Sequence, residues 1–193
     1  MPLPSPSTTQ PDLTCDLLVL GSGAGALSTA VTAAHLGLKV IVVEKDPHYG
    51  GTTAWSGGWM WVPCNPLAQR AGIIEDRSLP RTYLEHELGD HFDPTMIDAF
   101  LEAAPNMVSF FERHTALQFA DGNAIADIHG DTPGAGTGGR SVIAAPYNAY
   151  AVGKLLKRLR KTMRETSFMG MPIMAGHDLT AFLTLTRSWR SLL

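Results

Sequence analysis

The segment from Cys15 to Lys45 constrains the fold more than any other part of the sequence. It begins with a short apolar run, Leu17–Leu20, which has the length and composition of a strand buried on both faces. A glycine-rich turn over residues 21–26 leads into an alanine-rich stretch that ends just before Gly37. Glycine is typical of the residue that follows a helix, because φ is often positive there. A second apolar strand is expected over Val40–Val43.

Each position of this strand, turn, helix and strand has a mechanical reason. Gly21 permits the tight turn, Gly23 lets a phosphate approach the backbone, and Ala26 is small enough for the helix and strand to pack closely. The following helix begins with free N–H groups, which bind phosphate. Glu44 ends the second strand 23 residues after Gly21, near the spacing of the acid that holds a ribose hydroxyl. The pattern predicts a dinucleotide site, and the carboxylate favours FAD or NAD over NADP.

Composition narrows the class of protein. The chain has 193 residues, 45% of them hydrophobic and 17% charged, which is typical of a soluble globular domain. A net charge of −3 does not favour a nucleic-acid partner, and no apolar run is long enough to span a membrane. Residues 1–12, rich in Pro, Ser and Thr, predict a flexible tail. Only Cys15 and Cys64 are present, which excludes a disulfide framework and favours a cytoplasmic location.

Residues 46–66 depart from the regular alternation of an NAD-binding domain. Gly and Pro are too frequent for a helix or a central strand, so we expect a long irregular loop. The glycine pairs at 50–51 and 57–58 permit close approach to a flat ligand, and hydroxyl and tryptophan side chains lie between them. Such a loop in a compact domain is usually functional. The alternative is a tryptophan-rich core loop, since aromatic residues most often serve packing.

The sequence GGTTAWSGGWMWVP, together with the N-terminal motif, resembles the flavoprotein family of fumarate reductase and succinate dehydrogenase, and within it the 3-ketosteroid dehydrogenase branch. The resemblance is weaker beyond residue 65, through residues 133–134, 138–141 and 186–188. It implies that Glu44 holds the adenosine ribose of FAD and that the loop lies beside the pyrophosphate and isoalloxazine. The cofactor contacts expected from the motif and the resemblance are Gly21, Ser22, Gly23, Ala24, Gly25, Ala26, Glu44, Lys45, Gly51, Thr52, Thr53, Ser56, Gly57 and Gly58.

The resemblance also implies a reaction on a small-molecule substrate. Hydride transfer between flavin and a carbon next to an activated C–C bond would dehydrogenate a ketone or acid, or reduce an enone or enoate. A steroid ketone is the leading substrate, although Ile128 stands where steroid dehydrogenases of the family tend to carry a tyrosine. The sequence identifies no catalytic residue, which the resemblance places in later parts of the chain. Two alternatives stay open: an NAD-dependent Rossmann enzyme and a non-catalytic truncated remnant.

Helices are expected beyond the loop. Residues 78–89 predict one, Asp93 caps a second, and Pro105 separates the second from a third. The glycine-rich residues 121–141 predict a loop that folds over itself. A basic helix is expected over residues 150–164, with its charges in solvent and a buried leucine stripe at Leu155, Leu156 and Leu159. A last helix is expected after Asp178, and the scattered histidines His86, His91 and His114 predict no metal site.

These elements predict an α/β protein with a Rossmann-like FAD-binding βαβ unit, followed by a mainly helical segment and incomplete relative to the family. We expect a βαβ unit and flavin loop over residues 13–66, and a helical segment with a glycine-rich loop over 67–145. Residues 146–193 would begin a truncated cap or substrate domain. Because two parallel strands leave sheet edges and one face uncovered, the chain by itself is expected to associate and to lack turnover.

Overall fold

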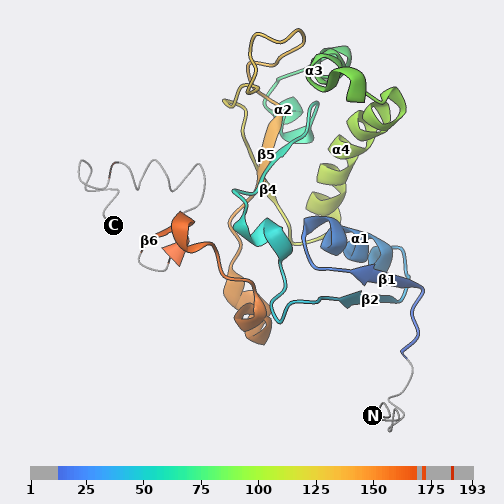
Figure 1. Ribbon diagram of the computed structural model, residues 1–193, viewed down its shortest axis with the longest axis vertical. Helices are drawn as coiled ribbons and strands as arrows, with labels where there is room; N and C mark the ends of the chain where they lie inside the picture. The colour runs from blue at the N-terminus through green and yellow to red at the C-terminus, as the bar shows by residue number, and fades with distance from the viewer. Residues whose placement is uncertain (1–12, 169–170, 173–183, 185–193) are drawn as a thin grey trace, which may run out of the picture. The chain divides into compact units, whose positions relative to one another are not determined.

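The computed structural model describes residues 13–168, 171–172 and 184 (Figure 1). The chain divides into two compact units, each of which is described by itself. The first unit contains the described residues up to Trp55 together with Lys154–Thr162, and the second contains Ser56–Gly153 and the described residues from Met163 onward. The predicted tail and the helix predicted after Asp178 lie outside the described residues.

The first unit is built on the predicted strand, turn, helix and strand. β1 (Leu17–Leu20) and β2 (Val40–Val43) pair in parallel, with Leu17 opposite Val40, and α1 (Ala24–His35) connects and contacts both strands. The helix ends at Leu36, and Gly37 follows with φ +86°. The Rossmann-like βαβ unit predicted from the sequence is confirmed.

The sheet of this unit differs from the prediction in its burial. Only Val19 of β1 is fully buried, whereas Leu18 and Leu20 are 54% and 74% exposed. The described part of the unit contains two strands and a single α-helix, α1, to cover them. The prediction that the first strand is buried on both faces is therefore wrong, because the described residues supply no second covering layer.

The segment over residues 149–158 is a 3₁₀ helix, η3 (Ala149–Arg158), and not the α-helix predicted over 150–164. Gly153 interrupts it with φ 58° and ψ −127°, a conformation that a helix interior does not accept. Leu155 is 57% exposed and Leu159 38% exposed, so the predicted buried leucine stripe is also wrong. Most of the basic side chains predicted to lie in solvent do so, whereas Arg160 is only 21% exposed.

The second unit contains a three-stranded antiparallel sheet that the sequence did not predict. Its order is β3 (Trp59–Trp61), β5 (Ser141–Ala144) and β4 (Phe119–Asp121), with Trp59 opposite Ile143 and Phe119 opposite Ala144. β3 is an edge strand, which agrees with the expectation that residues 46–66 hold no central strand.

The rest of this unit's regular structure is mainly helical. They are α2 (Pro66–Arg70), α3 (Ser78–Leu88), the 3₁₀ turn η2 (Gly89–His91) and α4 (Pro94–His114); near the end of the described chain lie η4 (Arg164–Thr166), β6 (Ser167–Phe168) and β7 (Met171–Pro172). Asp93 caps α4, accepting bonds from the N–H groups of Thr95 and Met96 as predicted. Pro105 lies inside α4, so the predicted break into two helices is wrong. The proline removes one backbone donor, and the apolar face continues on both sides of it.

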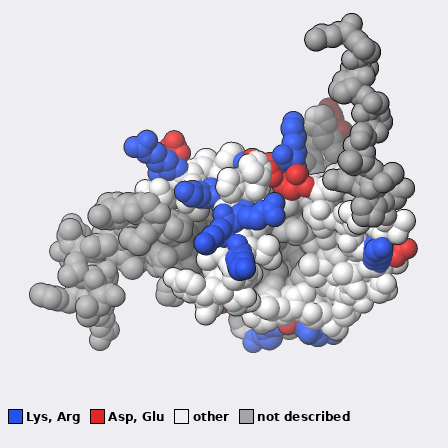
Figure 2. All heavy atoms as spheres, turned by 90° about the horizontal axis from the view of Figure 1, so that it is seen from below, with Lys and Arg blue, Asp and Glu red and all other residues white. Residues whose placement is uncertain are grey.

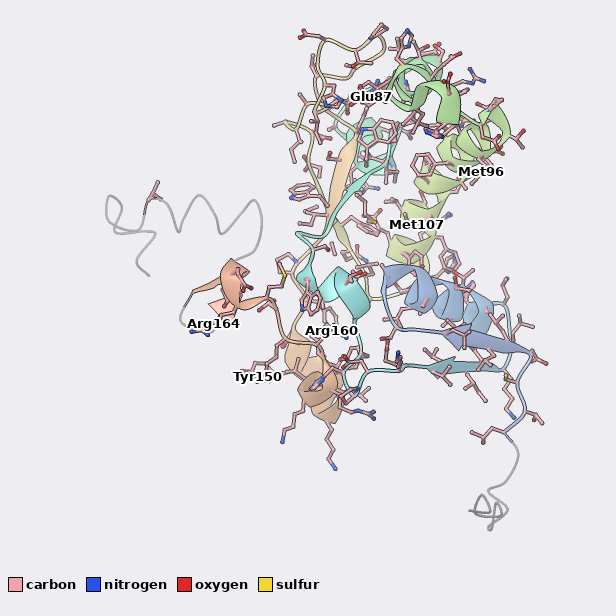
Figure 3. The ribbon with its side chains drawn as sticks, in the orientation of Figure 1. Glu87, Met96, Met107, Tyr150, Arg160 and Arg164 are labelled. Atoms are coloured by element: carbon pink, nitrogen blue, oxygen red, sulfur yellow. The ribbon has the colours of Figure 1, made fainter. Side chains whose placement is uncertain are left out.

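The core of the second unit gathers the sheet, α2 and α4. It consists of Val62, Leu67, Ala104, Val108, Phe111, Phe119 and Val142, with Met60, Met107 and Phe110 packed against it. Figure 3 labels Met107 and Met96 along α4. Met96 is 70% exposed, and the buried apolar face of α4 begins further along the helix, at Leu101.

Candidate functional site

The candidate site lies at the turn between β1 and α1 in the first unit. Gly21 bends the chain with φ +93°, and its N–H donates to the carbonyl of Val43 at 2.7 Å, which holds the turn against the end of β2. The first turn of α1 carries no acidic residue. The positive end of the helix dipole is therefore not neutralised by a carboxylate of that turn, and it can attract a bound anion such as phosphate.

A relay of hydrogen bonds connects the turn to the acid that ends the second strand. The N–H of Gly50 donates to Ser22 Oγ at 3.0 Å, and the Ser22 hydroxyl donates to Glu44 Oε2. Ser22 is only 3% exposed, so this hydroxyl is committed to the two groups. The sequence motif predicted Ser22 as a cofactor contact, and the structure shows that its side chain positions Glu44 and the loop.

Glu44 is held in its charged form. The N–H of Asp46 donates to Oε1 at 3.0 Å, and this bond, followed by that of Ser22, holds the pKa of Glu44 below its ordinary value. A carboxylate has about four acceptor positions, and the two bonds use half of them. The others remain suited to the donors that a ribose carries, namely its hydroxyl groups.

The loop that follows β2 folds back onto the glycine turn. Thr53, in the 3₁₀ turn η1 (Gly51–Trp55), accepts a bond from the N–H of Ala24 at 3.0 Å. Gly51 has φ +56°, and a Cβ on it would lie 3.0 Å from the Cα of Gly23. A side chain at position 51 would therefore force the loop or the turn to shift by a few tenths of an ångström. This contact unites two stretches that the sequence motif treats separately.

The geometry fits a dinucleotide cofactor. A Cβ placed on Gly21 or Gly25 would meet no atom within 4 Å, so there is open space in front of the turn where a pyrophosphate would lie. Around that space the unit supplies the start of α1, a charged carboxylate at Glu44 and a threonine hydroxyl at Thr53. These groups match the phosphate and ribose of FAD in the predicted arrangement.

The structure brings together most, but not all, of the predicted contacts. Gly21, Ser22, Gly23, Ala24, Glu44, Gly51 and Thr53 are joined by the contacts above, with Gly25 and Ala26 in the first turn of α1. Lys45 and Thr52 are exposed beside them. Ser56, Gly57 and Gly58 belong to the second unit, where Ser56 Oγ accepts a bond from the N–H of Gly58 at 3.2 Å.

Sequence reasoning missed two contributors to this arrangement. Asp46 follows Glu44 closely and donates to it, and the acid two residues after the predicted ribose ligand was a local signal that could have been used. Arg160, whose Nη2 donates to Asp46 Oδ2 at 2.6 Å, lies 114 residues away and carries no sequence signal.

A buried ionic cluster lies in the second unit. Arg140 is 1% exposed, and it donates to Asp127 Oδ2, to Glu75 Oε1 and to the carbonyl of Gly134. Asp127 also accepts from the indole N–H of Trp61 at 2.7 Å. The cluster lies at the base of the glycine-rich loop, and its groups are saturated with partners, which indicates support of the loop rather than a reacting site.

The glycine-rich loop folds over itself, as predicted. The N–H of Gly139 donates to the carbonyl of Asn123 at 3.1 Å, and the N–H of Asp127 donates to the carbonyl of Gly136 at 2.9 Å. At its outer part Ile128 is 92% exposed. The loop therefore has a closed base and a solvent-facing tip.

Two kinds of feature are absent from the residues that the structure describes. These residues contain no group of three or more His, Cys, Asp and Glu side chains placed to hold a metal ion. No helix among them is both long enough and apolar enough to cross a membrane.

Comparison with known proteins gives relatives whose names describe dehydrogenases of oxo compounds. The chain is 43% identical over 138 residues to a 3-oxosteroid 1-dehydrogenase of Mycobacterium tuberculosis, covering 72% of this chain and 24% of the relative. It is 35% identical over 179 residues to a 4-oxocyclohex-2-ene-1-carboxylate 5-dehydrogenase of Sinomonas cyclohexanicum, covering 93% of this chain and 30% of the relative. The likeness predicted from GGTTAWSGGWMWVP is confirmed.

A solved structure agrees. The 3-ketosteroid Δ1-dehydrogenase of Sterolibacterium denitrificans, in complex with 1,4-androstadiene-3,17-dione, matches with a TM-score of 0.81 and 34% identity. The match covers 91% of this chain and 31% of that one, so the chain spans 24–31% of the length of these relatives. The family model described as FAD binding domain matches residues 16–189. The chain belongs to this family of FAD-binding domains, and FAD is the cofactor that the family indicates.

Proposed function

We propose that this chain is the nucleotide-binding part of an FAD-dependent oxidoreductase that acts on a CH–CH bond next to a carbonyl. The observation that carries the proposal is the relay from Gly50 through Ser22 to Glu44, which holds a charged acid at one side of an open, glycine-lined turn. A merely structural glycine turn has no need of a buried serine committed to an ionised carboxylate.

Different residues of the site would bind different parts of FAD. Glu44 would accept hydrogen bonds from the adenosine ribose, and the start of α1 at Ala24–Ala26 would face the pyrophosphate. Residues 50–53 would fix the loop beside it, with Thr52 and Lys45 on the exposed side. When bound, FAD supplies the hydride-accepting centre. The complete proposed set is Gly21, Ser22, Gly23, Ala24, Gly25, Ala26, Glu44, Lys45, Gly51, Thr52, Thr53, Ser56, Gly57 and Gly58.

The proposed substrate is a cyclic ketone. The names of the two relatives given above share a six-membered ring with an oxo group, one in a steroid and one in a cyclohexene carboxylate. A 3-oxosteroid is the leading candidate, because the solved relative holds a steroid diketone. The monocyclic oxo acid is the second candidate, favoured by the relative that covers more of this chain. No electron acceptor is proposed.

Flavin binding by the 193-residue chain is the first test. The purified chain should bind added FAD and quench its fluorescence, and NAD in excess should not compete. A chain that binds NAD in preference to FAD would support the Rossmann alternative, and a chain that binds neither would support the non-catalytic remnant.

Turnover is the second test. A longer protein that contains this sequence should dehydrogenate a 3-oxosteroid or 4-oxocyclohex-2-ene-1-carboxylate in the presence of an artificial electron acceptor. Activity on amines or alcohols alone would refute the proposed reaction. The cytoplasmic location and the catalytic acid and base expected outside these residues stay predictions.

A further inference from the structure

Residues 154–162, here called the strap, lie along the proposed FAD loop of the first unit (Figure 1). The N–H of Tyr49 donates to the carbonyl of Arg158 at 2.9 Å, and the N–H of Arg160 donates to the carbonyl of Tyr49 at 2.8 Å. These two bonds form a parallel bridge between Tyr49 and Leu159. The strap is thus joined by its backbone to a loop about a hundred residues earlier in the chain.

Side chains join the same two segments. The indole N–H of Trp55 donates to the carbonyl of Lys161 at 3.1 Å. A Cβ placed on Gly50 would lie 3.4 Å from Leu159 Cδ1 and 3.6 Å from Arg160 Cβ, so the strap packs directly against the loop backbone. The contacts span the loop from Tyr49 to Trp55.

Arg160 makes the charged part of this contact (Figure 3). Its Nη2 donates to Asp46 Oδ2 at 2.6 Å, and its guanidinium lies 4.7 Å from the ring centroid of Trp55. One side chain therefore touches the beginning and the end of the loop. Its Nε is buried without a hydrogen-bond partner among the described residues, a cost that these two contacts must offset.

The loop that Arg160 holds is the one that positions the proposed ribose acid. Asp46, bound to Arg160, donates its own N–H to Glu44 at 3.0 Å. Gly50, packed against the strap, donates to Ser22, which in turn donates to Glu44. Both routes from the strap end on the same carboxylate.

A solvated basic segment is the simpler interpretation of the strap. Lysines and arginines do gather on the face seen in Figure 2, and Lys154, Lys157, Arg158 and Lys161 are all exposed. Arg160 differs from them, because its side chain is only 21% exposed and has an acidic and an aromatic partner. The general interpretation therefore accounts for the neighbours of Arg160 but not for Arg160.

We propose that Arg160 is a positioning residue for FAD binding, which holds residues 46–55 in the conformation that places Glu44 and Ser22. The inference rests on the proposed function, since it assigns the residue to the same cofactor site. Arg160 acts through the loop. Its removal should loosen the loop in the absence of FAD and weaken FAD binding as a result.

The test compares three variants of the full 193-residue chain by titration with FAD. Arg160→Met should raise the dissociation constant about five- to thirtyfold, as expected for a partly exposed ion pair plus one cation–π contact. Arg160→Lys, which keeps the charge but loses the planar group, should restore part of the affinity. Arg158→Met is the matched control, because it removes the same charge from the same strap at an exposed side chain, and it should change the affinity less than twofold.

Hydrogen exchange of the loop amides gives a readout that does not need FAD. The amides of residues 46–55 should exchange faster in Arg160→Met than in the unaltered chain. In Arg158→Met they should exchange at the same rate as in the unaltered chain. Asp46→Asn removes the same ion pair from the other side but leaves the contact of Arg160 with Trp55. The double variant Asp46→Asn/Arg160→Met should therefore bind FAD no more weakly than Arg160→Met alone.

The outcomes separate the two proposals. If the unaltered chain does not bind FAD, the proposed function fails, and loop exchange alone decides whether Arg160 positions the loop. If the unaltered chain binds FAD while Arg160→Met changes neither affinity nor loop exchange, the inference about Arg160 is overturned and the proposed function stands.

Discussion

Replacing Arg140 by methionine should destabilise the second unit more than any other single change of a charged residue that we consider. Arg140 is 1% exposed, and its side chain donates to Glu75, Asp127 and the carbonyl of Gly134. Methionine fills much of the same apolar space but leaves two carboxylates without their cation, and the Asp127 side chain is only 3% exposed. Breaking a buried pair in this way costs about 3–5 kcal/mol.

That loss is large against the whole stability of an ordinary domain, about 5–15 kcal/mol. With a denaturant slope of about 2 kcal/mol per molar urea, the unfolding midpoint should fall by about 1.5–2.5 M. The midpoint can be measured by tryptophan fluorescence at two protein concentrations, so that association is separated from unfolding. Arg70→Met is the control: Arg70 is 59% exposed in its pair with Glu112, so its loss should cost at most about 1 kcal/mol.

A second variant tests the cause. If uncompensated charge is responsible, adding Glu75→Gln and Asp127→Asn to Arg140→Met should recover part of the lost stability, although the arginine contacts remain absent. A midpoint shift for Arg140→Met no larger than that of Arg70→Met would refute the reasoning. So would a triple variant that is less stable than Arg140→Met alone.

Three further predictions concern the first unit. Glu44→Ala should weaken FAD binding about tenfold or more, while Glu102→Ala, a change at an exposed residue, should not. Bonds from Asp46 and Ser22 lower the pKa of Glu44, so the stability that its carboxylate adds is complete above the ordinary carboxyl pKa and is lost only as the pH falls through the lowered value. The difference in urea unfolding midpoint between Glu44→Ala and the unaltered chain should therefore be constant from pH 7 to about 5 and shrink below that. Gly51→Ala should weaken FAD binding, because its positive φ and a Cβ 3.0 Å from the Cα of Gly23 force the loop and the turn to shift. Gly130→Ala, where a Cβ meets no atom within 4 Å, should leave the affinity unchanged, and equal affinities of the two variants would contradict the close contact at Gly51. The chain alone should associate through the apolar face of β1 and lack turnover, and Leu18→Thr with Leu20→Thr should reduce its light scattering at fixed concentration, so that unaltered scattering would point to another surface.

The first unit was predictable because its information is local. Strand, turn, helix and acid all lie between residues 17 and 44, and the glycine and carboxylate positions are set by the geometry of the motif itself. The spacing of Glu44 predicted its place at the end of β2. It did not reveal that Ser22 would hold that carboxylate, because the pattern treats position 22 as variable.

The second unit was less predictable because its contacts are distant. β3 and β5 pair Trp59 with Ile143, and both strands are too short to show an alternating pattern. Pro105 signals a helix end locally, yet tertiary packing of Leu101, Val108 and Phe111 carries α4 past it. The α-helix predicted over residues 150–164 was wrong for the opposite reason. Gly153 was a local signal of an interruption, and the prediction gave it no weight.

In the glycine-rich loop of the second unit, the residues that fix the loop's shape lie at its base, and the exposed residue lies at its tip. Its base is closed by the bond between Gly139 and Asn123 and supported by Arg140, whereas Ile128 at the tip is 92% exposed. Mutations at the tip therefore carry almost no folding penalty, and those at the base carry nearly all of it. As far as folding is concerned, position 128 can accept other side chains while the loop keeps its shape, so a library confined to this codon would sample new surface chemistry without compensating mutations elsewhere.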